Sequence, residues 1–404
     1  MPKRLAYFLT HPIQYQVPMI RSLVQNGVPI NVLYGCDPAA EGHIDPGFER
    51  PITWDIPMLE GYEHQVLSNT HEMPAGRAAR FRAYGKRIKQ ALQNRSHSAA
   101  WVHGWGNSYP AVPHYSLAAI NAARHAGLPI LMRAETHLQC LRGNPLRRMI
   151  HRTILRIIFA RVSAFLAVGT ANAAFYKAYG VPDDRVFQMP YTVDNGFFQH
   201  RCLEASRTRE QFRRELSLPE NAPVVLFCGR LAPEKQPETL LRAMEKLSIG
   251  RAEKPVLLFV GDGPLRAELE SRADNSNANV RFCGFRNQTE LPAFYDLCDV
   301  FALPSDFEPW GLVVNEVMNA AKPVIVSDRV GSGADLVKQG VNGGIFRTGE
   351  VDALCSLLQP LLDDKNKRLR AGNESLEIIN RWSFNEDLAG LRAAMKSLHL
   401  ESDD

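Results

Sequence analysis

The chain has 404 residues, of which 45% are apolar and 22% are charged, and its net charge is +4. This is the composition of an ordinary globular protein with enough residues for two domains of about 150–200 residues each. Seven cysteines without a Cys-x-x-Cys pair argue against a disulfide framework or a zinc site, and favour reduced thiols in a cytoplasm. No apolar run reaches the roughly 18 residues of a membrane span.

Strands and helices alternate in the first half. The N-terminal apolar run is too short for a signal peptide, so it is expected to be the first strand. The expected elements are strand 5–9, helix 17–25, strand 30–34, strand 100–103, helix 115–126, strand 129–133, helix 146–161 and strand 164–168. A further helix is expected to start at Gly169-Thr170. The alternation indicates a parallel sheet with helices on both faces.

The alternation restarts after residues 189–198 (MPYTVDNGFF), which are typical of an exit from a domain. The expected elements are helix 204–216, strand 224–228, helix 237–247, strand 256–260, helix 265–273, strand 280–283, helix 290–297, strand 300–303, helix 312–321 and strand 323–327. The sequence therefore predicts an N-terminal domain (1–195), a C-terminal domain (196–380) and a final helix (381–404) that packs back on the first domain. Two doubly wound, Rossmann-like halves in tandem imply a cleft at the carboxyl ends of their strands.

The GRLAPEK run follows the expected strand 224–228. Gly229 lets the backbone pass close to a ligand, and Arg230 and Lys235 can both point into the mouth of the cleft. Arginine offers a fork for paired oxygens and lysine a mobile point charge. A lone basic pair is also common on solvated surfaces, so this motif alone does not decide the function.

The EPWGLVVNE run places two carboxylates eight positions apart around a Trp310-Gly311 turn. The amides of Gly311 and Leu312 would be free donors at a helix N-terminus, which suits a phosphate. Together with the two cations, these carboxylates suit a nucleotide-activated sugar. Glu316 can accept hydrogen bonds from the ribose hydroxyls, and Glu308 is nearer the hexose. By themselves, two acids here would equally complement the helix macrodipole.

Taken together, these runs resemble the donor domain of a retaining GT-B glycosyltransferase of the family 4 type, glycosyltransferase group 1. The matching runs lie between residues 224 and 346: GRLAPEKQPETLLRA, FVGDGPLRAELE, VRFCGF, LCDVFALPS, EPWGLVVNEVMNAAKPVIVSD and DLVKQGVNGGIF. Their order and spacing are those of the family. The resemblance implies a GT-B fold, in which two Rossmann-like domains face a central cleft. It also implies that the N-terminal domain (1–195) binds the acceptor and the C-terminal domain (196–380) binds the nucleotide-sugar donor.

The resemblance also implies roles for individual residues. Arg230 and Lys235 would bind the donor diphosphate, Glu308 the transferred sugar and Glu316 the ribose. The backbone around Cys283–Phe285 would frame the base. The donor-binding set implied by the resemblance is Gly229, Arg230, Lys235, Gly263, Cys283, Phe285, Glu308, Trp310, Gly311, Leu312 and Glu316.

The first half contributes candidate residues at the ends of its strands. His103 lies where such enzymes often place a histidine facing donor sugar and acceptor, so the catalytic set is His103, Glu308, Arg230 and Lys235. Many relatives carry a Gly-Gly loop after the first strand, and this chain does not. We therefore expect His11 or Gln14 to make the acceptor-side contact that this loop usually makes.

Another expected strand of the first half ends at Arg133-Ala-Glu135 and also faces the expected cleft. Arg133 and Glu135 complete the acceptor-side set. Glu135 is the only acid between residues 73 and 182, where 16 Lys and Arg occur. An ion pair between Arg133 and Glu135 is favoured over an acceptor contact.

The chain lacks an Asp-x-Asp motif, so a metal-dependent donor site would lack its usual ligands. We expect no metal or cofactor, because the cation pair can neutralise the leaving nucleoside diphosphate. No carboxylate is clearly placed as a nucleophile. The family implies transfer with retention at the anomeric carbon. For this we expect a front-face displacement, in which the donor phosphate helps to take the acceptor proton.

Charge is distributed unevenly, with 21 Lys and Arg against 12 Asp and Glu in residues 1–195, and 26 against 31 in the rest. The apolar side of helix 146–161 is expected either to be buried in the core, leaving its arginines solvated, or to dock on anionic lipid. The basic side chains of this half lie in two sets. One segment carries Arg77, Arg80, Arg82, Lys86, Arg87 and Lys89, and helix 146–161 carries Arg148, Arg152 and Arg156 at every fourth position.

These observations predict a metal-independent hexosyltransferase that uses a UDP- or GDP-linked sugar and a glycan or lipid-linked acceptor. Bacterial surface polysaccharide, lipopolysaccharide or glycolipid assembly would be its setting, in the cytoplasm or peripherally on the inner face of the cell membrane. One alternative is a GT-B nucleotide-sugar epimerase, which would not need such a basic acceptor domain. Another is a nucleic-acid-binding protein using residues 73–182. No zinc motif or recognition helix supports that alternative, and the acidic second half would repel a duplex.

Overall fold

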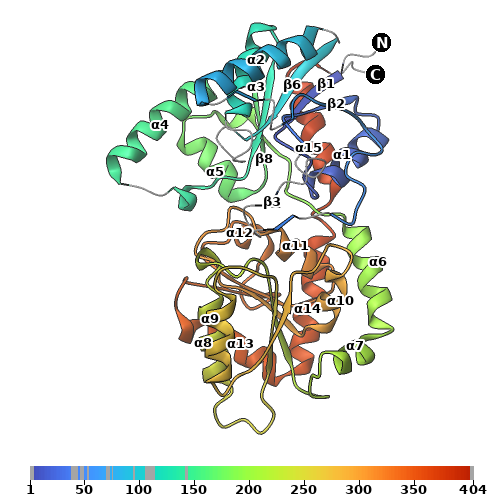
Figure 1. Cartoon of the computed structure of the whole chain (residues 1–404), viewed down its shortest axis with the longest axis vertical. Coiled ribbons are helices and arrows are strands. Elements are labelled where there is room, and N and C mark those ends of the chain that lie inside the picture. The colour runs from blue at the N-terminus through green and yellow to red at the C-terminus, as the bar shows by residue number, and fades with distance from the viewer. Residues whose placement is uncertain are drawn as a thin grey trace.

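The computed structural model describes residues 4–37, 44–45, 50–51, 54–69, 73–74, 76–93, 96–104, 114–141 and 144–400. The chain forms two α/β domains, one above the other along the long axis of the molecule (Figure 1). Each domain is built on a parallel sheet. The prediction of two doubly wound, Rossmann-like halves is thus confirmed.

The N-terminal domain has a seven-stranded sheet in the order β5-β2-β1-β6-β7-β8-β9. Its strands are β1 (Arg4–Leu9), β2 (Ile30–Tyr34), β5 (Glu63–Val66), β6 (His97–His103), β7 (Ile130–Ala134), β8 (Ala164–Ala167) and β9 (Val186–Gln188). Its helices are α1 (Gln16–Gln25), α2 (Arg77–Gln93), α3 (Tyr115–His125), α4 (Pro145–Phe159) and α5 (Thr170–Ala178), with short 3-10 turns η2 (Leu138–Cys140) and η3 (Asp183–Arg185). A separate pair, β3 (Ile44–Asp45) and β4 (Arg50–Pro51), is antiparallel.

The C-terminal domain has a six-stranded sheet in the order β12-β11-β10-β13-β14-β15. Its strands are β10 (Val224–Cys228), β11 (Val256–Val260), β12 (Asn279–Gly284), β13 (Val300–Leu303), β14 (Val324–Ser327) and β15 (Gly343–Phe346). Its helical elements are α6 (Asn195–Ser206), α7 (Arg209–Glu215), η4 (Pro233–Lys235), α8 (Pro237–Leu247), α9 (Arg266–Asp274), α10 (Leu291–Leu297), α11 (Leu312–Met318), α12 (Gly333–Leu336), α13 (Val351–Asp363) and α14 (Lys365–Ile379).

Side-chain alternation places the cores on both faces of the N-terminal sheet. In β1, Ala6 and Phe8 belong to one buried apolar cluster, and Leu5, Tyr7 and Leu9 belong to the other. Successive side chains of a strand point to opposite faces, so a strand buried on both sides reads as a continuous apolar run. The same reasoning explains why the fully buried strands β10 and β11 were readable from sequence.

Both sheets reverse their strand order next to the first strand of the domain. The reversal lies between β1 and β6 in one sheet and between β10 and β13 in the other. In open α/β sheets, ligands bind outside the carboxyl ends of the strands at such a switch point. The loops that leave β1, β6, β10 and β13 therefore mark where a ligand is expected.

The domains also touch directly. The Asp335 carboxylate accepts hydrogen bonds from the backbone N–H of Thr170 at 3.0 and 3.2 Å. Thr289 N donates to Asp55 Oδ2 at 3.0 Å. The chain crosses between the domains after β9, and its last helix, α15 (Phe384–Ser397), returns to pack against α1, β8 and β9. A capping box of Ser383 and Glu386 starts that helix.

The predicted element bounds agree closely with the structure where apolar runs are strong. Strands β2, β10, β11 and β13 and helix α8 have the predicted bounds. The predicted helix 204–216 is wrong, because it is divided between α6 and α7, and α6 starts inside the predicted exit segment. The Asp194 side chain caps α6 by accepting from Phe197 N. The pattern also does not predict β5, a polar sequence at the sheet edge, or the arginine-rich α2.

Candidate functional site

The two predicted motifs meet at the switch point of the C-terminal sheet. The GRLAPEK loop leaves β10, and the loop that carries Glu308 leaves the neighbouring strand β13. The backbone N–H of Asp306 donates to the carbonyl of Glu234 at 2.8 Å, which joins the two loops. Residues from separate motifs are therefore held next to one another by the main chain.

Lys235 and Glu308 form an ion pair within this junction, with Nζ donating to Oε2. The two side chains are only 23% and 13% exposed, so water screens the pair poorly. Arg230 Nη1 lies 3.9 Å from the Glu234 carboxylate. Its Nε is buried and has no hydrogen-bond partner among the described residues. The guanidinium thus keeps donor capacity for an anionic group in the cleft.

The start of α11 is shaped by Gly311, whose φ is +90°. A side chain there would be strained, and its Cβ would lie 3.1 Å from Glu308 Cγ and 3.2 Å from Val330 Cγ1. No side chain caps the helix within the described residues. The helix therefore presents its first amides, with Leu312 as its first residue, beside the Glu308 side chain.

Glu316 lies one turn further along α11 and is almost fully buried. Burial raises the pKa of the Glu316 carboxyl to about 7, although the Tyr295 hydroxyl, which donates to Oε2, partly lowers it. The carboxyl lines a cavity, so it can accept a hydrogen bond from a ligand hydroxyl. A ligand that donates to this carboxyl would favour its ionised form.

A first pocket, of about 360 Å³, surrounds these motifs and includes residues of both domains. Glu135, Tyr15 and Tyr191 line it from the N-terminal side and the linker. From the C-terminal domain the lining residues are Cys228, Gly229, Arg230, Lys235, Leu303, Glu308, Trp310, Gly311, Leu312 and Val313. The predicted diphosphate and sugar contacts therefore open on one cavity between the domains.

A second pocket adjoins the first and shares Tyr15, Cys228, Gly229 and Val313 with it. Glu316 lines it, together with Phe285 and the N-terminal residues Gln14 and Trp54. The neighbouring residue Arg286 also lines it. The cleft therefore holds two adjacent pockets, a more charged one and a more apolar one, as a phosphate and an aromatic base would require.

On the N-terminal side of the first pocket, His103 and Glu135 form a pair, with Nε2 3.6 Å from Oε1. Burial alone would raise the pKa of Glu135, but hydrogen bonds from His103 and Tyr191 and the charge of Arg133 together lower it. Glu135 is thus an ionised hydrogen-bond acceptor at neutral pH. The predicted partner of Glu135 was Arg133, and the structure shows His103 in that position.

His11 and Gln14, the two candidates after β1, are placed differently. Gln14 lines the second pocket, and its buried Oε1 has no hydrogen-bond partner among the described residues. His11 Nδ1 lies 2.9 Å from the hydroxyl of Thr10, and His11 lines neither pocket. Of the two, Gln14 is the side chain that the cleft brings to the candidate donor site.

Comparison with known proteins identifies part of the chain. Residues 208–377 match the family model described as glycosyl transferases group 1. This stretch of the chain is similar to a group 1 glycosyltransferase domain. The chain is 31% identical over 200 residues to D-inositol 3-phosphate glycosyltransferase of Corynebacterium glutamicum. The aligned stretch covers 48% of this chain and 47% of that protein. The chain is also 32% identical over 179 residues to a sulfoquinovosyl transferase of Arabidopsis thaliana, 43% of this chain and 34% of that protein. The chain spans about half the length of the curated relatives it matches.

The whole chain resembles a solved structure. Anabaena HepE in complex with UDP and glucose superposes with a TM-score of 0.73, covering 98% of this chain and 100% of HepE at 18% identity. At this identity the likeness concerns the fold alone. The GT-B fold predicted from the sequence is confirmed, and the stretch that matches the family model lies in its C-terminal half.

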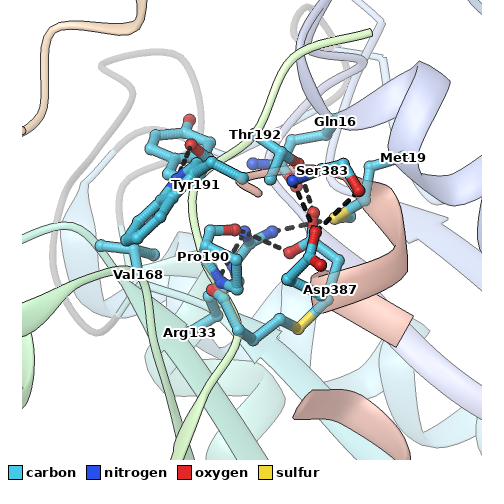
Figure 2. A network of polar contacts seen from close by, with 12 residues as sticks. Gln16, Met19, Arg133, Val168, Pro190, Tyr191, Thr192, Ser383 and Asp387 are labelled. Carbon is cyan, nitrogen blue, oxygen red and sulfur yellow. Dashed lines mark hydrogen bonds and ion pairs between the residues drawn. The ribbon is translucent and has the colours of Figure 1, made fainter. Parts of the chain in front are cut away.

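Arg133 is a correction to the predicted acceptor side. Its side chain is buried, and Nη2 donates to Asp387 Oδ1 of α15 at 3.0 Å (Figure 2). The same nitrogen donates to the carbonyl of Pro190, and the Thr192 hydroxyl donates to the other carboxylate oxygen. Arg133 therefore does not face the cleft. It ties the domain crossover to the C-terminal helix, 254 positions away in sequence.

Some residues of the predicted donor-binding set shape the cleft through packing. A Cβ on Gly263 would lie 2.5 Å from the Leu231 carbonyl oxygen, so its lack of a side chain permits close packing of two loops. Trp310 is buried, donates from Nε1 to Asn315 Oδ1 at 2.9 Å and stacks on Trp382. Cys283 lines neither pocket, and burial raises the pKa of its thiol.

Several residues that line the two pockets are not predicted from the sequence. They are Tyr15, Trp54, Tyr191, Arg286, Gln288 and Tyr295. Tyr15 follows the predicted Gln14, and Arg286 follows Phe285, so proximity to a motif could have indicated both. Tyr295 lies on α10 at a spacing typical of core residues, and only the structure shows its contact with Glu316.

The structure describes no group of three or more His, Cys, Asp or Glu residues that could hold a metal ion. In the same described ranges, no helix is long and apolar enough to cross a membrane.

Proposed function

We propose that the chain is a retaining glycosyltransferase, which moves a hexose-type sugar from a nucleoside-diphosphate sugar to an acceptor hydroxyl. The observation that carries this proposal is the Lys235–Glu308 pair at the switch point of the C-terminal domain, with Arg230 beside it. A cationic pair next to carboxylates at a strand-end cleft suits a diphosphate attached to a sugar.

The diphosphate would be held by Arg230 and Lys235. An ammonium group has three donors, so Lys235 can keep its bond to Glu308 and still donate to a phosphate oxygen. Arg230 can donate from its unpartnered Nε. As the bond between sugar and phosphate breaks, negative charge grows on the leaving diphosphate. Fixed positive groups then stabilise the transition state more than the ground state.

The nucleoside would occupy the second pocket. Glu316 would accept from the ribose hydroxyls, and the base would lie near Phe285. HepE, whose fold this chain shares, was solved with UDP and glucose. That complex supports testing a UDP-linked hexose first and a GDP-linked sugar second.

Transfer would proceed on the face of the sugar that the diphosphate leaves. Glu308 is paired with Lys235, which makes its carboxylate a poor nucleophile. We therefore propose a front-face displacement without a metal ion, in which a donor phosphate oxygen takes the acceptor proton. Retention at the anomeric carbon would be its outcome.

The acceptor would enter between the domains on the side of His103 and Glu135. The ionised Glu135 carboxylate can accept a hydrogen bond from an acceptor hydroxyl, and His103 orients that carboxylate. We propose a glycan or lipid-linked acceptor, in bacterial surface polysaccharide or glycolipid assembly at the cytoplasmic side. The basic first domain supports an acceptor that carries negative charge.

A panel of UDP- and GDP-sugars in a thermal-shift assay tests the donor proposal, because a ligand that binds only the native state raises the melting temperature. Hydrolysis of the best donor is then followed with and without EDTA, and NMR gives the anomeric configuration of the product. The proposal predicts a raised melting temperature, activity in EDTA and a retained anomer. No stabilisation by any nucleotide sugar, or loss of activity in EDTA, would contradict it.

A further inference from the structure

Helix α4 presents an apolar face to solvent. Five large apolar side chains on it, Leu146, Met149, Ile150, Ile154 and Ile157, are each between 51% and 60% exposed. They recur every one to four positions, so on a helix they share one broad face. Isolated exposed apolar residues are normal, but a contiguous exposed patch marks an interaction site.

This arrangement contradicts one of the two expectations for this helix. Burial of its whole apolar side is wrong, because among the described side chains of α4 only Leu155, Ile158 and Phe159 pack into the domain. The helix lies at the outer edge of the N-terminal domain, away from the C-terminal domain (Figure 1). Of the ten large apolar side chains exposed in the described residues, six lie between positions 138 and 157.

A groove of about 300 Å³ runs beside the apolar face. Ile154, Ile157 and Ile158 of α4 form one wall of the groove. The opposite wall comes from α2 and α3, with Phe81, Leu117 and Ile120. Two exposed arginines, Arg124 and Arg161, also line it. The groove therefore offers apolar walls for a hydrocarbon chain and guanidinium groups for a phosphate at the same place.

The surroundings of the patch are strongly basic. Arg148, Arg152 and Arg156 are exposed on α4 itself. The neighbouring helix α2 adds exposed basic residues, namely Arg77, Arg82, Lys86 and Lys89. The one acid of residues 73–182, Glu135, lies in the cleft and pairs with His103. Arg156 at the edge of the apolar face, and Arg124 and Arg161 at the groove, form a basic rim beside that face. This combination complements an anionic lipid surface, where arginines bind headgroup phosphates and apolar side chains enter the acyl region.

We propose that α4 and the groove beside it dock this protein on an anionic phospholipid bilayer. A second copy of the chain would bring two basic rims together, and like charges would repel. A nucleic-acid duplex offers no apolar surface to cover the isoleucines. Because α4 follows β7 and η2, its first turn lies on the side where the strands of this domain end at the cleft. Docking there would present membrane-bound molecules to the acceptor side, and it does not depend on the identity of the donor.

Flotation of the full chain with lipid vesicles tests the proposal. Vesicles of phosphatidylglycerol mixed with phosphatidylcholine are compared with vesicles of phosphatidylcholine alone, at low and at high salt. The proposal predicts binding to the anionic vesicles only, weakened by salt. The Arg124→Gln, Arg161→Gln double variant should bind about 30-fold more weakly, the scale expected for two headgroup contacts. The Ile150→Ser, Ile154→Ser double variant should also lose most binding at unchanged charge.

Matched controls separate this surface from general effects. Leu203→Ser removes an equally exposed apolar side chain from α6, and Arg207→Gln with Lys338→Gln removes two exposed cations from the other domain. Both controls should bind anionic vesicles as the unchanged protein does. Equal loss in controls and α4 variants would overturn the proposal. Two other results would also overturn it. One is a protein that does not bind vesicles but forms a dimer that Ile154→Ser disrupts, and the other is binding of duplex DNA through the same arginines.

Discussion

Lys235 donates a hydrogen bond to Glu308 across the two loops that leave the neighbouring strands β10 and β13. The two residues are 73 positions apart in sequence, and each belongs to a motif that is visible in the sequence alone. Because the pair is largely buried, each residue fixes the position of the other at the mouth of the first pocket. Loss of either member should therefore disturb both the diphosphate and the sugar contact.

Lys235→Ala should lower turnover about 100-fold or more, the scale of losing one preorganised charge stabiliser. The donor diphosphate would lose its mobile cation, and Glu308 would lose the partner that holds it. Steady-state kinetics with the best donor measure the change. Lys338→Ala, which removes an exposed lysine of the same domain, is the control and should keep its rate. A wild-type rate in Lys235→Ala would remove this residue from the site.

Donor binding should depend on the protonation of Glu316. Burial raises the pKa of this carboxyl to about 7, so it is partly protonated in the free protein near neutral pH. Ribose hydroxyls donate to the ionised form, so affinity should rise as the pH rises through about 7 and fall below it. Titration calorimetry with a UDP-linked hexose, whose diphosphate has no proton to lose in this range, measures this from pH 6 to 8, about one unit either side of the pKa. Glu316→Gln should bind more weakly and lose the pH dependence; a profile like that of the unchanged protein would exclude Glu316.

The same carboxyl predicts the opposite trend for stability without ligand. Its pKa is higher in the folded than in the unfolded chain, so the folded state binds the proton more tightly between about pH 4.5 and 7. Its contribution to the free energy of unfolding is fully present at low pH and is lost as the pH rises through about 7. Glu316→Gln should therefore stabilise the free protein by about 1–3 kcal/mol at pH 8. Urea unfolding at pH 5 and pH 8 checks this, and equal effects at the two pH values would argue against it.

His103→Ala should reduce sugar transfer more than donor binding. The histidine pairs with Glu135 on the proposed acceptor side, and it lines neither of the two pockets. The expected pattern is a lowered kcat with an almost unchanged Kd for UDP. His125→Ala, which alters an exposed histidine of the same domain, is the matched control. Unchanged transfer in His103→Ala would separate this residue from the reaction.

Asp387→Ala should destabilise the protein by about 3–5 kcal/mol, because it leaves the buried Arg133 guanidinium without its counter-charge. The pair joins β7 and the domain crossover to α15 (Figure 2). Thermal unfolding measures the loss. Asp352→Ala removes an exposed acid that pairs with Lys246 and should cost far less. Equal melting temperatures for the two variants would contradict the structural role given to Asp387.

The fold, and the position of four candidate residues close behind strands, were predictable because their signals are local. Buried parallel strands are continuous apolar runs, and Arg230, Lys235, Glu308 and Glu316 each follow such a run by a few residues. Contacts between distant segments carry no such signal. Asp387 lies behind a polar turn near the C-terminus, and nothing in its neighbourhood indicates a contact with Arg133.

The exposed side of α4 shows the same limit from another direction. The helical period identifies Ile150, Ile154 and Ile157 as an apolar face, but the period is the same whether that face is covered or not. Only the packing of the neighbouring helices shows that a different set, Leu155, Ile158 and Phe159, is buried.

The most direct test of the donor site is titration calorimetry of UDP with the unchanged protein and with the Arg230→Ala, Lys235→Ala double variant, both in EDTA. The account predicts that the unchanged protein binds UDP without a divalent cation and that the double variant loses binding by about 100-fold or more, as two charge-assisted contacts to the diphosphate disappear. Undiminished binding by the double variant, or binding by the unchanged protein only when a divalent cation is added, would contradict it.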